Sequence, residues 1–232
     1  PLLTLARAFT RGLLYLEPRY CKYVDTILID GKCVFAAPPG LPLIISPLTI
    51  FYDRIGSLVT GGIIVAVFGF LAVISTIFYT RVFTNDWRKA VFYSIVIALA
   101  GPLWIYSTHI FPQAPLAFTY TLLIYLALKA LRNELKTPLY LLAGFTASLT
   151  ILLNPAMFIP VLIIALIVFT KHVLNIKARN TDVSTMVKRV FLFLLGVLPL
   201  MIFLLEYNQA TTGDPFTPPE FLWLRKITIP CP

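Results

Sequence analysis

Basic side chains that could bind an anionic group are concentrated near the start of the chain. Arg19, Lys22 and Lys32 combine an arginine fork with lysine ammonium groups, and both kinds of group bind phosphate, so a lipid-linked phosphate is the chemistry they suggest. Arg7 and Arg11 precede them, and we assign these two to membrane-surface anchoring, in which long basic side chains extend from an interfacial helix. The spacing alone does not choose between binding and anchoring for the other three.

Two carboxylates lie among these basic residues. Asp30 with Gly31 is a good turn pair between residues 26–29 and 33–36, which predicts a small hairpin and a structural role for Asp30. That role leaves Asp25 open as a functional carboxylate.

Further polar residues flank the later apolar blocks and are expected on the same membrane face. His109 could bind a site ligand or merely satisfy a backbone group at a helix end. Gln113 and Asn154 could be helix N-caps or polar residues at helix ends, and Pro155 at the first helical position suits this for Asn154. The polar residues of this kind are Tyr106, Ser107, His109, Gln113, Glu206, Tyr207, Asn208 and Asp214.

The common signatures of soluble enzymes do not occur. The sequence has no glycine-rich phosphate loop, HExxH, GxSxG or Cys/His cluster. Cys21, Cys33 and Cys231 lack metal-ligand spacing, and for Cys21 and Cys33 a disulfide and a reduced buried pair both stay open. No cofactor is predicted, and the sequence leaves a divalent metal undecided.

Composition places these residues in a membrane protein. Of 232 residues, 59% are hydrophobic and 12% are charged, against about 25% charged in a soluble domain. The net charge of +9 resides mainly in the links between apolar blocks, as membrane topology requires, so no nucleic-acid partner is expected. We predict an all-α, polytopic transmembrane helical bundle with external interfacial helices.

The apolar blocks predict six spanning helices. The fourth and fifth have 16 and 15 residues, or about 22 to 24 Å at 1.5 Å per residue, which is less than a hydrocarbon core of roughly 30 Å. The six predicted helices are residues 57–79, 90–107, 113–131, 138–153, 156–170 and 190–205.

The positions of lysine and arginine predict the orientation. Residues 80–89, 130–137 and 171–189, with Lys129, contain eleven basic residues, whereas the links 108–112 and 154–155 contain none. The first set is therefore expected in the cytoplasm of a multi-pass cell-membrane protein, with the other links outside. By parity, residues 1–56 form an external segment before the six-helix region 57–205, and residues 206–232 begin another.

Two interfacial helices are expected within residues 1–56. Residues 41–52 are apolar but too short to span and contain Pro47, which suits a helix lying in the outer interface. Residues 2–16 carry an apolar face, with Arg7 and Arg11 four positions apart, which predicts a short amphipathic helix.

Four ordered stretches resemble a known family. They are DGKCVFAAPPGLPLIISP at 30–47, YSTHIFPQAPLA at 106–117, GFTASLTILLNP at 144–155 and YNQATTGDPF at 207–216. Together they are similar to GT-C type membrane glycosyltransferases, the multi-spanning relatives of dolichyl-phosphate-mannose protein mannosyltransferases and bacterial aminoarabinose transferases. The resemblance covers residues 5–216, and the order of the stretches carries it.

The resemblance implies transfer of a sugar from a polyprenyl-phosphate donor to a protein, lipid or glycan acceptor at the external face. The family's catalytic carboxylate usually follows the first spanning helix, and LARAFTRGLLYLEP at 5–18 resembles the part just downstream. We therefore expect the first helix and the principal acid to lie before Pro1, in a longer protein. Where relatives often carry an acid or histidine, this chain has Gln113.

Roles in this sequence follow from the resemblance. Asp25 is the expected surviving catalytic carboxylate, and His109 could replace the acid or histidine missing at Gln113. Arg19, Lys22 and Lys32 are expected to bind the donor phosphate. The expected substrate-binding residues are Asp30, Tyr106, Gln113 and Glu206.

Two other classes of protein stay open. A transporter or flippase would use polar residues near the bilayer midplane and broken, repeated helices, but the predicted spans carry no acidic residue, and their one basic residue, Lys129, lies at an edge. A non-enzymatic subunit of a membrane assembly is the second alternative, and the sequence argues against it only weakly.

Overall fold

The chain forms two compact units, each described by itself below. A computed structural model describes residues 1–22, 25–29, 31–177 and 182–222. The terminal unit comprises Pro1–Ile64 and Met201–Pro232, and the central unit comprises Val65–Leu200.

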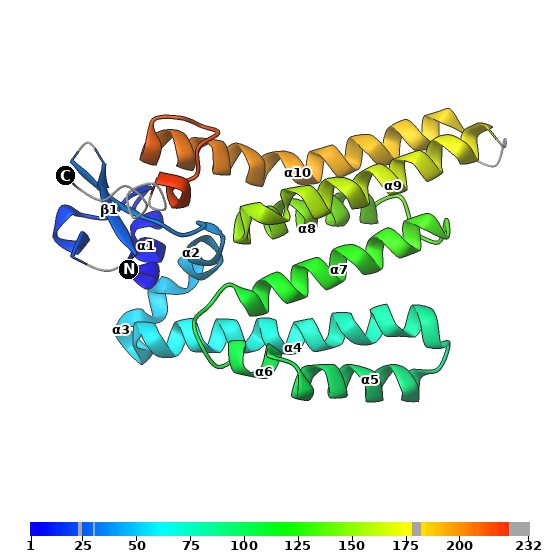
Figure 1. The fold of residues 1–232 in the computed structure, drawn as a ribbon, viewed down its shortest axis with the longest axis horizontal. Helices are drawn as coiled ribbons and strands as arrows, with labels where there is room; N and C mark the ends of the chain where they lie inside the picture. Colours follow the sequence, from blue (N-terminus) through cyan, green and yellow to red (C-terminus); the bar gives the residue numbers. More distant parts are fainter. Residues whose placement is uncertain (23–24, 30, 178–181, 223–232) are drawn as a thin grey trace, which may run out of the picture. The chain divides into compact units, whose positions relative to one another are not determined.

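Long helices make up most of the fold, as Figure 1 shows. Among the described residues, four helical segments are long and apolar enough to cross a membrane: Ser57–Thr84, Gln113–Leu131, Pro155–Asn175 and Val183–Thr212. The prediction of a mainly helical, membrane-embedded protein is confirmed at this level. The principal helices are α4 (Ser57–Thr84), α5 (Trp87–Ala100), α6 (Leu103–Tyr106), α7 (Gln113–Leu131), α8 (Leu139–Leu153), α9 (Phe158–Lys177) and α10 (Val183–Thr212).

The predicted second span, residues 90–107, is wrong because the helix breaks at Gly101. Gly101 is extended, with φ −92° and ψ 175°, which is the conformation that a following proline favours. Helix α5 therefore has 14 residues, about 21 Å, and the four-residue α6 follows it. Asp86 starts α5 three residues early, since its side chain accepts a hydrogen bond from the Arg88 amide at 2.9 Å.

Other predicted helices were too short. The prediction stopped helices where charged residues begin, but lysine and arginine are good helix formers and can extend past an apolar block. Helix α9 consequently has 20 residues rather than 15, and α10 has 30 rather than 16, with Pro199 inside it. The bounds of α7 agree with the prediction, and α8 is short as expected.

Close helix packing in the central unit depends on glycine. A Cβ on Gly69 would lie 2.4 Å from the Ser107 Cβ, and one on Gly144 would lie 2.0 Å from the Phe193 carbonyl oxygen. At the end of α8, Asn154 accepts a hydrogen bond from the Ala156 amide at 3.1 Å and Pro155 begins a 3-10 turn, η3 (Pro155–Met157). The predicted cap at Asn154 is confirmed.

The terminal unit begins with α1 (Leu2–Phe9), followed by η1 (Pro18–Tyr20). The predicted helix over residues 2–16 is wrong in extent, because the chain reverses at Gly12, where φ is 73°. The predicted hairpin is confirmed: β1 (Thr26–Ile29) pairs antiparallel with β2 (Lys32–Phe35). Asp30 lies outside the described residues.

Helical turns continue after the hairpin through α2 (Gly40–Ile45), η2 (Ser46–Phe51) and α3 (Tyr52–Ile55). The predicted single helix over residues 41–52 is thus divided, and the middle part is a 3-10 helix that starts with Pro47 in its first turn. Pro39 occupies the cap position of α2, so the Pro-Pro-Gly sequence at 38–40 joins the hairpin to this helix.

The core of the terminal unit joins the hairpin to the end of α10. Its buried members are Leu5, Leu16, Cys33, Phe35 and Tyr207. The Tyr207 ring is edge-on to Phe9 at 6.1 Å, and its hydroxyl donates to the Phe35 carbonyl at 3.4 Å. A disulfide joins Cys21 to Cys33. Of the two alternatives that the sequence left open, the structure therefore has the disulfide and not the reduced pair.

Candidate anion-binding site

A polar cavity of about 190 Å³ lies in the terminal unit, and arginine is its most frequent lining residue. Three of the arginines that precede the hairpin reach it from two separate segments of the chain. We call it the arginine cavity, and its lining residues are Thr4, Arg7, Ala8, Arg11, Leu13, Tyr15, Leu16, Glu17, Arg19 and Tyr20.

The end of α1 produces this arrangement. The Thr10 hydroxyl donates to the Arg7 carbonyl at 2.8 Å, and the Leu13 amide donates to the Ala8 carbonyl at 3.0 Å. With the reversal at Gly12, residues 13–20 turn back toward α1. The Leu16 amide then donates to the Cys33 carbonyl at 2.7 Å, which attaches the returning segment to the hairpin.

The arginines of the cavity have few counter-charges. Arg19 Nε lies 2.7 Å from Glu17 Oε2, and Arg7 Nη2 lies 3.6 Å from Asp53 Oδ1. Among the described residues, Arg11 makes no ion pair. Exposed ion pairs of this kind contribute only about 0 to 1 kcal/mol, so an anion could displace them. The cavity can therefore accept a multiply charged anion such as a phosphate.

The predicted placement of Arg7 and Arg11 on one helix is wrong. Arg11 lies beyond the end of α1, and both arginines line the cavity with Arg19. The sequence signal was the glycine at position 12, which separates Arg11 from the following aromatic segment and ends the helix. The spacing of Arg7 and Arg11, which suits one helix, did not reveal this helix end.

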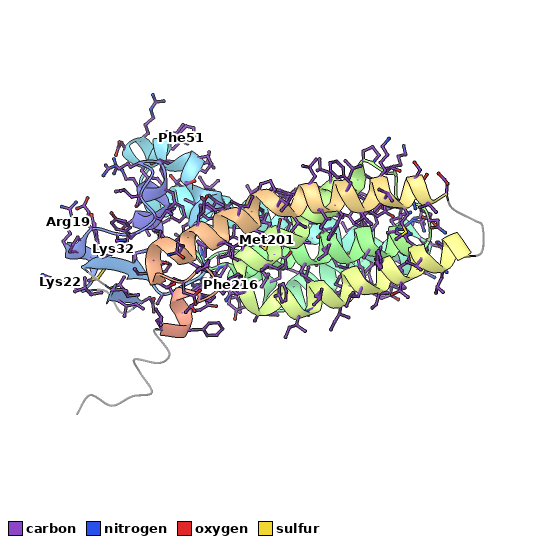
Figure 2. All side chains as sticks on the ribbon, turned by 90° about the horizontal axis from the view of Figure 1, so that it is seen from above. Arg19, Lys22, Lys32, Phe51, Met201 and Phe216 are labelled. Carbon is purple, nitrogen blue, oxygen red and sulfur yellow. A yellow bond between two sulfur atoms is a disulfide. The ribbon has the colours of Figure 1, made fainter. Side chains whose placement is uncertain are left out.

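The disulfide brings the other predicted phosphate-binding residues together. Lys22 follows Cys21 and Lys32 precedes Cys33, and the Cα atoms of the two cysteines are 5.4 Å apart. Lys32 Nζ donates to the Ala210 carbonyl at 3.3 Å and lies 5.3 Å from the Tyr15 ring centroid. Since Tyr15 also lines the arginine cavity, Lys32 adjoins it. Figure 2 shows Arg19, Lys22 and Lys32 at the hairpin side of the terminal unit.

The carboxylate that lines the cavity is Glu17, not Asp25. Asp25 is exposed just before β1, where its carbonyl accepts a hydrogen bond from the Ala36 amide at 2.8 Å. Glu206 is exposed on α10 and does not line the cavity. Sequence reasoning missed Glu17, whose only signal was its place beside Pro18 and Arg19. No group of three or more metal-ligating side chains occurs in the part of the chain that the structure describes.

Tyr106, His109 and Gln113 belong to the central unit, where an aromatic cluster joins the first two. The Phe111 ring lies 6.4 Å from Tyr106 and 6.3 Å from His109. His109 Nδ1 is 2.9 Å from the Ile105 carbonyl oxygen, which agrees with a role at a helix end. Gln113 is exposed as the first residue of α7, and Pro112 occupies the cap position instead. Gln113 is therefore a polar residue at the start of the helix, as one predicted alternative had it, and not its N-cap.

The YNQATTGDPF stretch ends α10. Gly213 has φ 79°, and the side-chain amide of Asn208 (Nδ2) donates to the Pro215 carbonyl at 2.9 Å. The Asp214 carboxylate accepts hydrogen bonds from the Thr217 hydroxyl and the Phe216 amide. These bonds, that of Thr217 first, lower the pKa of Asp214. The stretch thus has a structural explanation that the resemblance did not supply.

A half-buried carboxylate, Glu220, follows this turn. Burial raises the pKa of Glu220, although the residue does not line the arginine cavity.

Burial also raises the pKa of Tyr52 to about 12, with Arg7 acting in the opposite direction. The Tyr52 hydroxyl therefore stays protonated beside the arginines.

Comparison with known proteins identifies no relative: no family model, curated protein or solved structure matches the chain.

Proposed function

We propose that this protein is a membrane glycosyltransferase that transfers a sugar from a polyprenyl-phosphate donor to a hydroxyl acceptor at the external membrane face. The observation that carries the proposal is the arginine cavity, in which Arg7, Arg11 and Arg19 converge in one polar pocket of about 190 Å³. Arginine forks match the oxygens of a phosphate and remain charged at any working pH.

The segment next to this cavity suits a lipid donor. Apolar side chains of η2 and α3 are exposed, among them Ile50 at 71% and Ile55 at 47%. The Arg7–Asp53 ion pair and the contact of the Tyr52 hydroxyl with the Leu3 carbonyl at 3.5 Å join this segment to α1. A donor could thus place its phosphate among the arginines and its isoprenoid chain along the apolar segment at the membrane surface.

The disulfide supports an external site. Disulfides persist in oxidising compartments and are rare in the cytosol. The Cys21–Cys33 bond lies in the same unit as the arginine cavity, so we assign this unit to the outer side. The Lys and Arg distribution of the loops predicts the same orientation.

The reaction exchanges one bond at the anomeric carbon of the sugar. The acceptor oxygen forms a bond to this carbon while the carbon–oxygen bond to the phosphate breaks, and the electron pair leaves with the phosphate. The acceptor proton passes to a carboxylate, and the arginines neutralise the charge that develops on the departing polyprenyl phosphate. Glu17 and Asp25 are the carboxylates of this unit that we assign to the acceptor side.

The test is transfer of radiolabelled sugar from a polyprenyl-phosphate donor in membranes that contain the protein. We expect Arg11→Gln and Lys32→Ala each to reduce transfer about tenfold or more, the value of one charge-assisted hydrogen bond. Glu17→Gln and Asp25→Asn identify the carboxylate that takes the acceptor proton, because transfer should fall in the variant that removes it. Arg54→Gln is the matched control, because Arg54 is exposed on α3 and does not line the cavity.

Two outcomes would contradict the proposal. Equal loss in Arg54→Gln and Arg11→Gln would mean that general surface charge, not the cavity, matters. Donor binding without any transfer, in the parent protein as well as the variants, would favour a non-enzymatic membrane subunit.

A further inference from the structure

The central unit contains a second cavity, of about 200 Å³, that the proposed reaction does not use. Helices α7, α8, α9 and α10 surround it, and Figure 1 shows these helices side by side. Most of its wall is apolar, with Leu123, Ala147, Val161 and Phe193 from the four helices. An aqueous solute would gain little from such a wall.

One end of this cavity is polar. Tyr140, His172 and Arg189 line it, and they come from the first turn of α8, the last turns of α9 and the early part of α10. The Tyr140 hydroxyl lies 2.7 Å from His172 Nε2, and the Arg189 guanidinium carbon lies 5.5 Å from the Tyr140 ring centroid. Three residues distant in sequence thus make one cationic end.

This polar end is incompletely satisfied. His172 is 2% exposed, and neither its Nδ1 nor Arg189 Nε has a hydrogen-bond partner within the described residues. In the tautomer in which the Tyr140 hydroxyl donates to Nε2, His172 Nδ1 carries a proton, and Nδ1 and Arg189 Nε are then both free donors. Leaving a buried donor unpaired is unfavourable, and more so when the group is charged. An acceptor with negative charge would satisfy both.

Nearby acidic residues do not supply that acceptor. Glu134, in the link between α7 and α8, is paired with Lys129, and no described residue forms an ion pair with Arg189. The rest of the cavity requires an apolar group, and two of its lining residues, Leu166 and Phe169, are 54% and 46% exposed on α9. The cavity therefore opens toward the surface that α9 presents.

We infer that this cavity binds an anionic membrane phospholipid, with the phosphate at Arg189 and His172 and one chain among α7, α8, α9 and α10. The charge at one end, the apolar wall and the opening along a helix able to cross a membrane match the three parts of that ligand. The inference is independent of the proposed transferase activity, since the arginine cavity belongs to the other unit.

Native mass spectrometry of the delipidated protein in detergent tests the site with dioleoyl-phosphatidylglycerol as the probe. We expect one retained lipid per protein and at least about a tenfold weaker affinity in Arg189→Gln, the loss expected for a charge-assisted hydrogen bond. Lys188→Gln is the matched control, because it removes the same charge from the neighbouring, exposed residue. Ala165→Leu should also weaken binding by filling the cavity, whereas Ala117→Leu, outside the cavity lining, should not.

Separate arms with other probes distinguish the ligand classes. Inorganic phosphate alone should not bind detectably, and dioleoyl-phosphatidylcholine should bind at least tenfold more weakly. The inference is overturned if Lys188→Gln and Arg189→Gln lose equal affinity, if Ala165→Leu has no effect, or if phosphatidylcholine binds as well. Preferential binding of a polyprenyl phosphate would also overturn it, since the site would then belong to the donor.

Discussion

Gly144 and Gly196 place α8 and α10 in direct backbone contact. A Cβ on Gly144 would lie 2.0 Å from the Phe193 carbonyl oxygen, and a Cβ on Gly196 would lie 2.2 Å from the Leu141 carbonyl oxygen. Each glycine therefore faces the backbone of the other helix. Membrane helices often associate through small residues in this way. Lipid chains are as apolar as the side chains, so association depends on close van der Waals packing rather than on the hydrophobic effect.

Adding a methyl group at either glycine should separate these helices. We expect Gly144→Ala and Gly196→Ala each to destabilise the protein by about 1 to 3 kcal/mol, the usual cost of overpacking. Thermal unfolding in detergent measures this as a lower midpoint.

Gly62→Ala provides the control for that experiment. Gly62 is also within a long helix, but nothing lies within 4 Å of an added Cβ, and alanine is the better helix former by about 1 kcal/mol. Its midpoint should stay constant or rise. Equal loss in all three variants would refute the close contact as the cause.

The sequence predicted those elements whose ends are marked by local chemistry. The hairpin followed from Asp30-Gly31, and α7 began and ended where its apolar block did. Predicted ends were misplaced where charged residues continue a helix beyond its apolar block, as in α10. The Gly101-Pro102 pair could have predicted the helix break at Gly101. Apolar residues on both sides of it instead suggested one continuous span over residues 90–107.

The candidate site was harder to predict, because it depends on a chain reversal. Arg19, Lys22 and Lys32 were selected by charge, and the disulfide and β2 do place Lys22 and Lys32 near one another. Arg11 and Glu17 become cavity residues only through the turn at Gly12 and the bridge of Leu16 to Cys33. Spacing along a helix carries no information about a segment that folds back.

Reduction should weaken the terminal unit. The Cys21–Cys33 bond closes a loop with a sequence separation of 12, and a loop of roughly this size contributes about 3 kcal/mol. Dithiothreitol should therefore lower the unfolding midpoint of the parent protein. The double variant Cys21→Ser/Cys33→Ser should have the lower midpoint already and should not respond to dithiothreitol; a further response would show that another thiol is responsible.

The turn after α10 should lose stability in acid. Because its hydrogen bonds lower the pKa of Asp214 in the folded state, the unfolded state binds the proton more readily, and the stabilisation is present above the ordinary pKa of an aspartate. It is lost as the pH falls through the lower, folded value. Asp214→Asn should therefore show a smaller fall in unfolding midpoint between neutral and acidic pH than the parent protein. Thr217→Val, which removes the main hydrogen bond, should reduce the fall partly, and an unchanged pH profile in both would contradict the assignment.

Phosphate should stabilise the folded protein through the arginine cavity. A ligand that binds only the folded state raises stability by RT ln(1 + [L]/Kd), so inorganic pyrophosphate should raise the thermal midpoint in detergent at low ionic strength. Arg11→Gln and Arg19→Gln should each remove most of this rise, whereas Arg54→Gln should keep it. The rise should also shrink with added sodium chloride, because the arginines are exposed and salt screens exposed charges over about 10 Å at 0.1 M. A rise that persists at high salt, or in Arg11→Gln, would place the anion elsewhere in the protein.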